Sequence, residues 1–350
     1  MNTLGKNFVF TSFGESHGKA IGGVLDGVPA GVRIDMDLIR EALDKRAGRV
    51  KGDEARGEEH PKMPRAFSGT PLGREAGVSS RALREGDEVE WLSGVMDGVT
   101  LGTPIAFIIR NADTRSEDYD WLKHNYRPGH ADRTYQEKYG IRDHRGGGRA
   151  SARETASRVV AGSVAQQLLK EKGVEIQAKL VQVGEEKHPE LFDEYSAAIQ
   201  RDGDSIGGIV ECVITGLSSG VGEPIFDKLQ SHLAFAMMSI NGCKGFEYGS
   251  GFEGVGLKGS EMYLTDNQTL ISGGMAGGIS DGTPVVFRCV FKPTASNRKT
   301  FEKAYPHPLP EGKGEDKRIV GRHDSCIAVR AVAVVEAMTA LVVQDLCNFG

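Results

Sequence analysis

The sequence predicts a single domain that combines α-helices with β-strands. Its 350 residues can bury a large core without disulfide or metal staples. Strand-like apolar runs recur along the chain, two segments have the apolar pattern of long helices, and no convincing linker separates them. Glycine supplies 47 of the 350 residues, nearly twice the usual share of about 7%. We therefore expect many tight turns between ordered elements.

The sequence predicts several short strands and one capped helix. A helix is expected over 37–46, with Asp35 and Asp37 available to cap its N-terminus. The polar segment 52–78 carries three prolines and no steady period, so we expect a mobile surface insertion there. Strands are expected over the apolar runs 8–10, 21–25, 88–92, 104–110, 206–214 and 284–291.

Two longer helices have the clearest patterns. The segment 151–172 carries apolar residues at i+4 spacing and ends before Gly173, a residue suited to follow a helix C-cap. The segment 325–347 is apolar nearly all round and is therefore expected to be buried.

A faint internal repeat links two glycine-rich turns. Asp97 and Asp281 are 184 residues apart, whereas Thr103 and Thr283 are 180 residues apart. Because that alignment needs a four-residue gap, chance similarity of glycine-rich turns is favoured, and one domain over 1–350 is predicted.

Composition excludes some classes of function. Lys and Arg number 43 against 48 Asp and Glu, a net charge of −5, which does not suit a surface that tracks nucleic acid or anionic lipid. No stretch approaches the roughly 20 apolar residues of a membrane span. The five cysteines form no Cys-x-x-Cys pair, and the first residues do not resemble a signal peptide. A cytoplasmic protein is therefore expected, with neither nucleic acid nor membrane as partner.

The segment 127–158 is locally basic, with eight Lys or Arg against four Asp or Glu. Glycines 146–148 precede Arg149, Ser151 and the predicted helix, an arrangement that favours an anion cradle. A solvated helix start with loop arginines and an RNA-binding patch are the alternatives. The turn Lys292-Pro293-Thr294-Ala295-Ser296 also suits phosphate, although alone it is only a turn.

His17 lies on a short loop between glycines, where an imidazole can face a ligand. Gly14-x-Ser16-x-Gly18 matches the pattern of a nucleophile elbow, but no credible helix follows, so that interpretation is rejected. No pair of histidines has a ligand spacing, so no metal site is predicted. Asp324 precedes the buried helix, where helix capping would also explain a carboxylate.

Three separated segments together resemble the signature regions of the chorismate synthase family, and the likeness covers nearly the whole chain. Any one of them could match by chance, whereas the ordered set is highly specific. The segments are FGESHGKAIGGVLDGVPAG at 13–31, RPGHADRTYQEKYGIRDHRGGGRASARETASRVVAGSVA at 127–165, and GRHDSCIAVRAVAVVEAM at 321–338.

The resemblance implies an α+β fold, a β-α-β sandwich in which helices pack between antiparallel sheets, assembled as a homotetramer. It implies a carbon–oxygen lyase that eliminates phosphate from 5-enolpyruvylshikimate 3-phosphate by anti-1,4-elimination, giving chorismate. Reduced FMN would be required without net redox change, as a transient electron donor to the substrate. We expect an external flavin reductase as partner, because no further nucleotide fold is evident, and NADPH only where flavin is reduced in situ.

The resemblance also implies roles for individual residues. His17 resembles the acid that protonates the departing phosphate, and His130 the residue that protonates reduced flavin. Asp324 resembles the carboxylate of the base relay, with Ser16 and Ser151 as its hydroxyl partners. Arg46 resembles an arginine for anionic substrate or NADPH, and Arg49 a neighbour of it. The implied FMN contacts are Arg149, Ala150, Ser151, Asn241, Gly242, Gly277, Lys292, Pro293, Thr294, Ala295, Ser296 and Arg322.

The chain departs from the family pattern at several positions. Leu83 stands about where the family has an arginine, and Leu270-Ile271 replaces a usual Asn-His. Ala150 and Ser325 replace a usual serine and proline. None of these positions is assigned a proton transfer.

Two rival functions remain open from sequence. A flavin reductase or flavin-binding protein would use the anion-binding loops, but would leave His17, His130 and Asp324 idle. An RNA-binding module on 127–158 would bind with strong salt dependence and without flavin.

Overall fold

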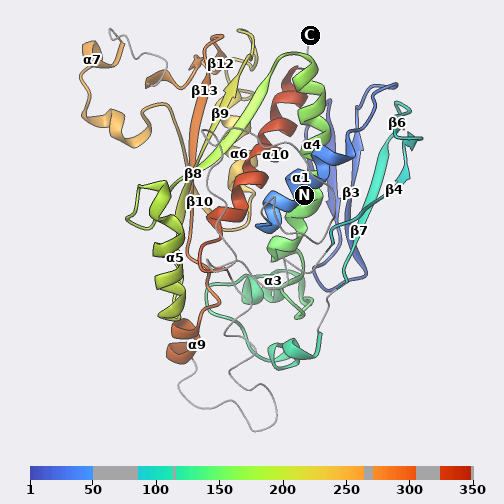
Figure 1. The fold of residues 1–350 in the computed structure, drawn as a ribbon, viewed down its shortest axis with the longest axis vertical. Helices are drawn as coiled ribbons and strands as arrows, with labels where there is room; N and C mark the ends of the chain where they lie inside the picture. Colours follow the sequence, from blue (N-terminus) through green and yellow to red (C-terminus); the bar gives the residue numbers. More distant parts are fainter. Residues whose placement is uncertain (50–85, 113–115, 264–270, 305–323, 348–350) are drawn as a thin grey trace.

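The structure is a computed structural model that describes residues 1–49, 86–112, 116–263, 271–304 and 324–347. The segment 52–78, for which a mobile insertion is expected, lies outside the described residues, as do Leu83, Leu270 and Arg322. Two antiparallel sheets enclose a layer of helices (Figure 1). This arrangement confirms the α+β sandwich that the resemblance implies.

The first sheet has the strand order β1-β2-β3-β7-β4, and every neighbouring pair is antiparallel. Alternation along β7 buries Ile105, Phe107 and Ile109 on one face, as a strand with a single covered face requires. The strands are β1 (Thr3–Leu4), β2 (Val9–Phe13), β3 (Ala20–Asp26), β4 (Val89–Ser93) and β7 (Ile105–Arg110).

The second sheet has the order β10-β13-β9-β8 and is also antiparallel throughout. Its central strands bury alternate residues, among them Val210 and Cys212 in β9 and Phe287 and Cys289 in β13. The strands are β8 (Glu175–Val183), β9 (Gly208–Thr215), β10 (Cys243–Tyr248) and β13 (Val285–Phe291).

The layer between the sheets consists of α1 (Met36–Ala47), α4 (Thr155–Glu171) and α10 (Ala328–Cys347). Helix α4 contacts β2, β3 and β7, while α10 contacts β8 and β9, so the pair joins the two sheets. The two helices approach closely at Gly162, where an added Cβ would lie 2.4 Å from the Cα of Ala337. Only glycine allows this approach.

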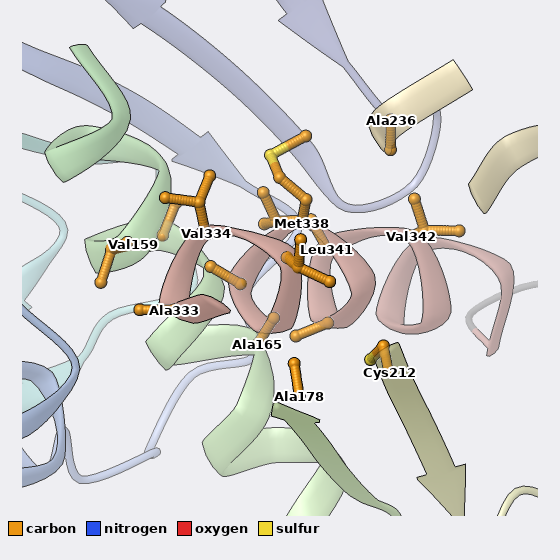
Figure 2. Packing of buried hydrophobic residues seen from close by; sticks show 14 of the residues in the cluster. Val159, Ala165, Ala178, Cys212, Ala236, Ala333, Val334, Met338, Leu341 and Val342 are labelled. Atoms are coloured by element: carbon orange, nitrogen blue, oxygen red, sulfur yellow. The ribbon is translucent and has the colours of Figure 1, made fainter. Parts of the chain in front are cut away.

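Helix α10 is the centre of the core. Figure 2 shows its apolar side chains surrounded by residues of α4, of α6 (Leu229–Met238) and of strands β8 and β9. Near its end, the buried carboxylate of Asp345 accepts hydrogen bonds from the backbone N–H groups of Lys6, Asn7 and Phe8 at 2.8, 2.6 and 2.8 Å. The helix thereby fixes the chain just ahead of β2.

Shorter elements connect these layers. Their bounds are η1 (Ser116–Lys123), α3 (Asp132–Tyr139), η2 (Gly148–Ala150), η3 (Ala152–Glu154), η4 (Pro189–Leu191), α5 (Phe192–Arg201), η5 (Gly251–Gly256), α7 (Gly259–Tyr263) and α9 (Arg298–Ala304).

The faint repeat in the sequence corresponds to a repeated local structure. A hairpin of β5 (Val95–Met96) and β6 (Val99–Thr100) leads into β7, and a hairpin of β11 (Met275–Ala276) and β12 (Ile279–Ser280) leads into β13. Each element of the second unit begins 180 residues after its counterpart. The four-residue gap in the sequence alignment was wrong, because it matched turn glycines instead of the hairpins.

The predicted strands and helices are present, with shifted ends. All six strands are found, and their ends are displaced by at most three residues. Asp35 caps α1 by accepting from the backbone N–H groups of Asp37 and Leu38, both at 3.0 Å, so Asp37 lies inside the helix. Helix α4 begins at Thr155 instead of 151, because 148–154 form 3-10 turns, and Gly173 follows its C-cap at φ +76° as expected.

Candidate active site

The turn between β2 and β3 carries Ser16 and His17. Both are buried, at 1% and 6% exposure. The backbone N–H of Gly18 donates to the carbonyl oxygen of Glu15 at 2.9 Å, which closes the turn. Because the turn joins two antiparallel strands, the rejection of a nucleophile elbow is confirmed.

His17 is enclosed by two later segments. Its ring makes an edge contact with the ring of Tyr119, with centroids 4.8 Å apart. Gly146 lies so close that an added Cβ would stand 2.3 Å from Cδ2 of His17, and its φ is +62°. This first glycine of the Gly-Gly-Gly run is therefore required by backbone conformation and by space.

His130 is held by contacts between the two halves of the chain. Its Nε2 is 2.6 Å from Oγ of Ser296, in the segment that follows β13. The ammonium group of Lys292 donates to the carbonyl oxygen of Gly129 at 2.8 Å. These contacts attach the 127–131 loop to the second sheet.

A buried ion pair fixes the same loop at its ends. The guanidinium of Arg127 donates to both carboxylate oxygens of Asp132, at 2.9 and 2.8 Å, and the backbone N–H of Arg127 donates to the same group at 3.0 Å. Burial favours the neutral form of Asp132, but the hydrogen bonds and charge of Arg127 outweigh it and lower the pKa of Asp132 below its usual range.

The predicted anion cradle has a different local geometry from the one expected. Arg149 lies in η2, and its guanidinium donates to Ser12 Oγ at 2.6 Å and to the carbonyl oxygen of Gly14 at 3.3 Å. It therefore fastens the glycine-rich run to the first sheet. Ser151 caps η3 by accepting from the backbone N–H of Arg153 at 3.3 Å.

Asp324 pairs with a cation of α10. Its carboxylate accepts from Nη1 of Arg330 at 2.9 Å, and Nε of Arg330 donates to the backbone oxygen of Arg46 at 3.1 Å. Ser325 Oγ lies 2.8 Å from Ser196 Oγ. An ion pair therefore accounts for Asp324 at this position.

These segments surround a cavity of about 590 Å³, within the size range of sites for small molecules. Among the residues that the structure describes, five cations line it: Arg127, Arg153, Lys244, Lys292 and Arg330. Burial and the nearby charge of Lys244 lower the pKa of Lys292, as expected for a cation that faces other cations. The charge balance of the wall favours an anionic ligand.

The structure brings most of the residues assigned from sequence to this cavity. Those that line it are His17, His130, Ala150, Ser151, Asn241, Gly242, Lys292, Thr294, Ala295 and Asp324. Ser16 lies beside His17 within 2.9 Å of a Cβ built on Gly146, and Ser296 stands behind His130.

Other assigned residues lie elsewhere. Arg46 is fully buried against Asp87, and Arg49 pairs with Asp44 at 2.7 Å near the end of α1. Gly277 lines a separate cavity of about 780 Å³ beside β10 and β11. Pro293 is not among the residues that line either cavity.

Sequence reasoning missed several residues of the wall. Tyr119, Arg127, Arg153, Lys244 and Arg330 were not assigned roles. Arg127 and Arg153 belong to the basic 127–158 segment, where excess charge was the only signal. Arg330 is a cation in a helix apolar nearly all round, and that mismatch alone could have indicated it.

Within the described residues, no helix combines the length and apolar character needed to cross a membrane. The same residues contain no group of three or more His, Cys, Asp and Glu side chains placed to hold a metal ion.

The sandwich and its cation-lined cavity with two histidines define an enzyme site for a small anionic molecule. Comparison with known proteins identifies the family. The family model described as chorismate synthase matches residues 8–77 and 69–347. This chain therefore belongs to the chorismate synthase family, a family of carbon–oxygen lyases, and the resemblance found in the sequence is confirmed.

Curated relatives support the same assignment over nearly the whole length. The chorismate synthase of Christiangramia forsetii is 45% identical over 376 aligned residues, covering 98% of this chain and 96% of that protein. The chorismate synthase of Porphyromonas gingivalis is 43% identical, covering 99% and 95%. A solved structure, "Crystal Structure of Chorismate Synthase", superposes with a TM-score of 0.67 at 27% identity, covering 98% of this chain and 92% of that one.

Proposed function

We propose that this chain eliminates phosphate from 5-enolpyruvylshikimate 3-phosphate to give chorismate, with reduced FMN as cofactor. The observation that carries the proposal is that His17, His130 and Asp324, from three distant parts of the chain, line one cation-rich cavity. A flavin reductase or flavin store would have no use for this set of proton donors and acceptors.

The cavity wall fits the cofactor. Thr294 lines the cavity, and its buried Oγ1 has no hydrogen-bond partner among the described residues, so its capacity to hydrogen-bond remains unused. Lys292 supplies charge beside it, and the amide of Asn241 stands across from Ala150, whose carbonyl oxygen it contacts at 3.1 Å. These residues, with Gly242, Ala295 and Ser151, would hold FMN. Reduced FMN, when bound, supplies an electron to the substrate transiently, with no net redox change.

The side chains of the wall divide the remaining work. Three arginines of the wall attract the phosphate and carboxylates of the substrate: Arg127, Arg153 and Arg330. Their fixed charges replace the water that surrounds these substrate groups in solution. His17 donates a proton to the departing phosphate, with Ser16 beside it. His130, oriented by Ser296, is the proton donor toward the cofactor. Asp324, held by Arg330, is the final proton acceptor, with Ser151 as its hydroxyl partner.

The decisive experiment is an anaerobic assay that measures release of both phosphate and chorismate. The purified protein receives 5-enolpyruvylshikimate 3-phosphate with chemically reduced FMN, oxidised FMN, or oxidised FMN plus NADPH. We expect turnover only in the assay with reduced FMN. Oxidised FMN plus NADPH should give none, because the proposed source of reduced flavin is an external flavin reductase. NADPH consumption without release of phosphate would instead support a flavin reductase.

We further propose that the chain is a single domain that assembles as a homotetramer in the cytoplasm. Several large apolar side chains are exposed, including Phe226, Phe252 and Val255 at 90%, 82% and 93%, and exposed apolar surface favours association. All five cysteines are free thiols, which suits a reducing compartment. Light scattering after size-exclusion chromatography should give about four times the 37.7 kDa chain mass.

A further inference from the structure

Asp87, Arg46 and Arg153 form a buried charge cluster. The carboxylate of Asp87 accepts from Nη2 of Arg46 at 2.8 Å and from Nη1 of Arg153. The side chains of all three residues are at most 4% exposed. Asp87 also has φ +47°, a backbone conformation that non-glycine residues rarely adopt. The position is thus constrained by both its charge and its backbone.

The charges in this cluster depend on one another. Burial opposes the ionisation of Asp87, but Arg46 and Arg153 outweigh it and lower its pKa below the usual range. Burial lowers the pKa of Arg46 to about 10, while Asp87 acts in the opposite direction. One carboxylate therefore balances two guanidinium groups, of which Arg153 lines the cavity.

Asn111 connects this cluster to the turn that carries His17. It follows β7, and its Oδ1 accepts from Nε of Arg153 at 3.0 Å. Its Nδ2 donates to the carbonyl oxygens of Gly18 at 2.9 Å and Glu15 at 3.1 Å. Its backbone N–H donates to the carbonyl oxygen of Lys19 at 3.1 Å. The two residues that flank Ser16 and His17 are thus bonded to a single side chain.

We infer that Asp87 and Asn111 are positioning residues for His17. Asp87 holds Arg153, Arg153 orients the amide of Asn111, and Asn111 fixes the turn between Glu15 and Gly18. Neither residue lines the cavity, so both act through others. The inference extends the proposed function, because it concerns the placement of the proposed acid.

Two substitutions at Asn111 separate the parts of this connection. Asn111→Asp keeps an acceptor for Arg153 but loses both hydrogen bonds that the amide donates to the turn. Asn111→Ala loses all three side-chain hydrogen bonds. We expect kcat with 5-enolpyruvylshikimate 3-phosphate to fall about 10- to 100-fold in both, since misplacement of about 1 Å can cost 10²-fold. KM should stay within about twofold, because Arg153 keeps its ion pair with Asp87 in both variants.

Hydrogen–deuterium exchange supplies a readout that does not need turnover. The amides of residues 14–19 should exchange at least about tenfold faster in both variants, while those of α4 and α10 are unchanged. Asn7→Ala is the matched control, because Asn7 donates to the backbone oxygen of Asp345, in another part of the fold. It should alter neither exchange at 14–19 nor kcat.

Asp87→Asn tests the origin of the connection. We expect the same faster exchange at 14–19, with a rise in KM of about tenfold because Arg153 loses its partner. If this variant does not fold, the Asn111 variants still decide the matter. Unchanged exchange at 14–19 in both of them, or a rise in KM at constant kcat, would overturn the inference. If the wild-type protein has no lyase activity, the exchange result stands by itself and only the proposed function fails.

Discussion

The two histidines of the cavity are held in different ways, one by contacts nearby in the same sheet and the other by a contact with a distant segment of the chain. His17 belongs to a closed turn between adjacent strands of the first sheet, and its turn is bonded to Asn111, which follows a neighbouring strand. His130 belongs to a loop ahead of α3, and its partner Ser296 lies 166 residues away, after a strand of the second sheet. The first depends on the first sheet, whereas the second depends on the segment that follows β13 in the second sheet. A reaction that needs both histidines therefore reports on the packing of the whole sandwich.

Removal of His17 should give the largest effect. His17→Ala is expected to lower kcat by about 10²- to 10⁴-fold, the usual contribution of a positioned acid. Steady-state phosphate release at saturating reduced FMN measures this. His188→Ala is the control, since that side chain is 72% exposed and does not line the cavity. A variant that keeps more than a tenth of wild-type kcat would remove His17 from the mechanism.

The ion pair beneath the His130 loop offers the next largest effect. Asp132→Asn should lower the free energy of unfolding by about 3 kcal/mol at pH 7, because it leaves Arg127 buried and unpaired. Since the pKa of folded Asp132 is depressed, its contribution is complete above the unfolded value of about 3.9 and is lost as pH falls through the folded value. Urea unfolding between pH 3 and pH 7 should thus show a flatter pH dependence in the variant.

Asp120→Asn serves as the companion measurement, because Asp120 pairs with Lys123 in solvent. It should leave the unfolding curve unchanged at both ends of the pH range. An equal loss of unfolding free energy in the two variants would show that the buried Arg127–Asp132 pair contributes no more to stability than an exposed pair.

The contact between the His130 loop and the segment after β13 can be weakened at one hydroxyl. Ser296→Ala removes the partner of His130 Nε2 and should lower kcat about tenfold, the value of one hydrogen bond. Ser296→Thr keeps a hydroxyl and should retain most activity. The pH–rate profile should shift in the alanine variant only, and a shift in both would point to a steric cause.

The smallest effect is expected at the ring that contacts His17. Tyr119→Leu should lower kcat about threefold, since an aromatic edge contact contributes about 0.5–1.5 kcal/mol. Tyr119→Phe keeps the ring and should match wild type in the same assay. A loss in the phenylalanine variant would assign the effect to the hydroxyl group instead.

The sequence predicted elements with strong periodicity and missed those without it. The run 104–110 became β7, and the apolar segment 325–347 became α10, because one buried face or a fully buried surface leaves a clear pattern. Strand β8 was missed because it is an edge strand whose EIQAKLVQV sequence mixes four polar with five apolar residues and buries only Ala178 and Val183. Local propensity contains little information about a strand with weak burial.

The site shows a similar division. Residues within the signature segments, such as His17 and Ser151, line the cavity. The pairing of Arg149 with Ser12 and of Arg330 with Asp324 depends on tertiary packing, which no local pattern shows. Gly277 lies in a different cavity, and Arg322 is outside the described residues.

The hydrogen bonds from the N–H groups of Lys6, Asn7 and Phe8 to Asp345 can form only at the end of biosynthesis, after Asp345 has been added to the chain. Lys6 leaves the peptidyl-transferase centre 339 residues before its partner exists. At about 5–20 residues per second, the ribosome needs roughly 20–70 s to supply it. Until then the second sheet lacks α10, which packs against β8 and β9, and this part of its apolar face is exposed. Nascent chains of this family member should therefore depend on chaperone protection until α10 is synthesised, and stalling before α10 should leave them sensitive to proteases.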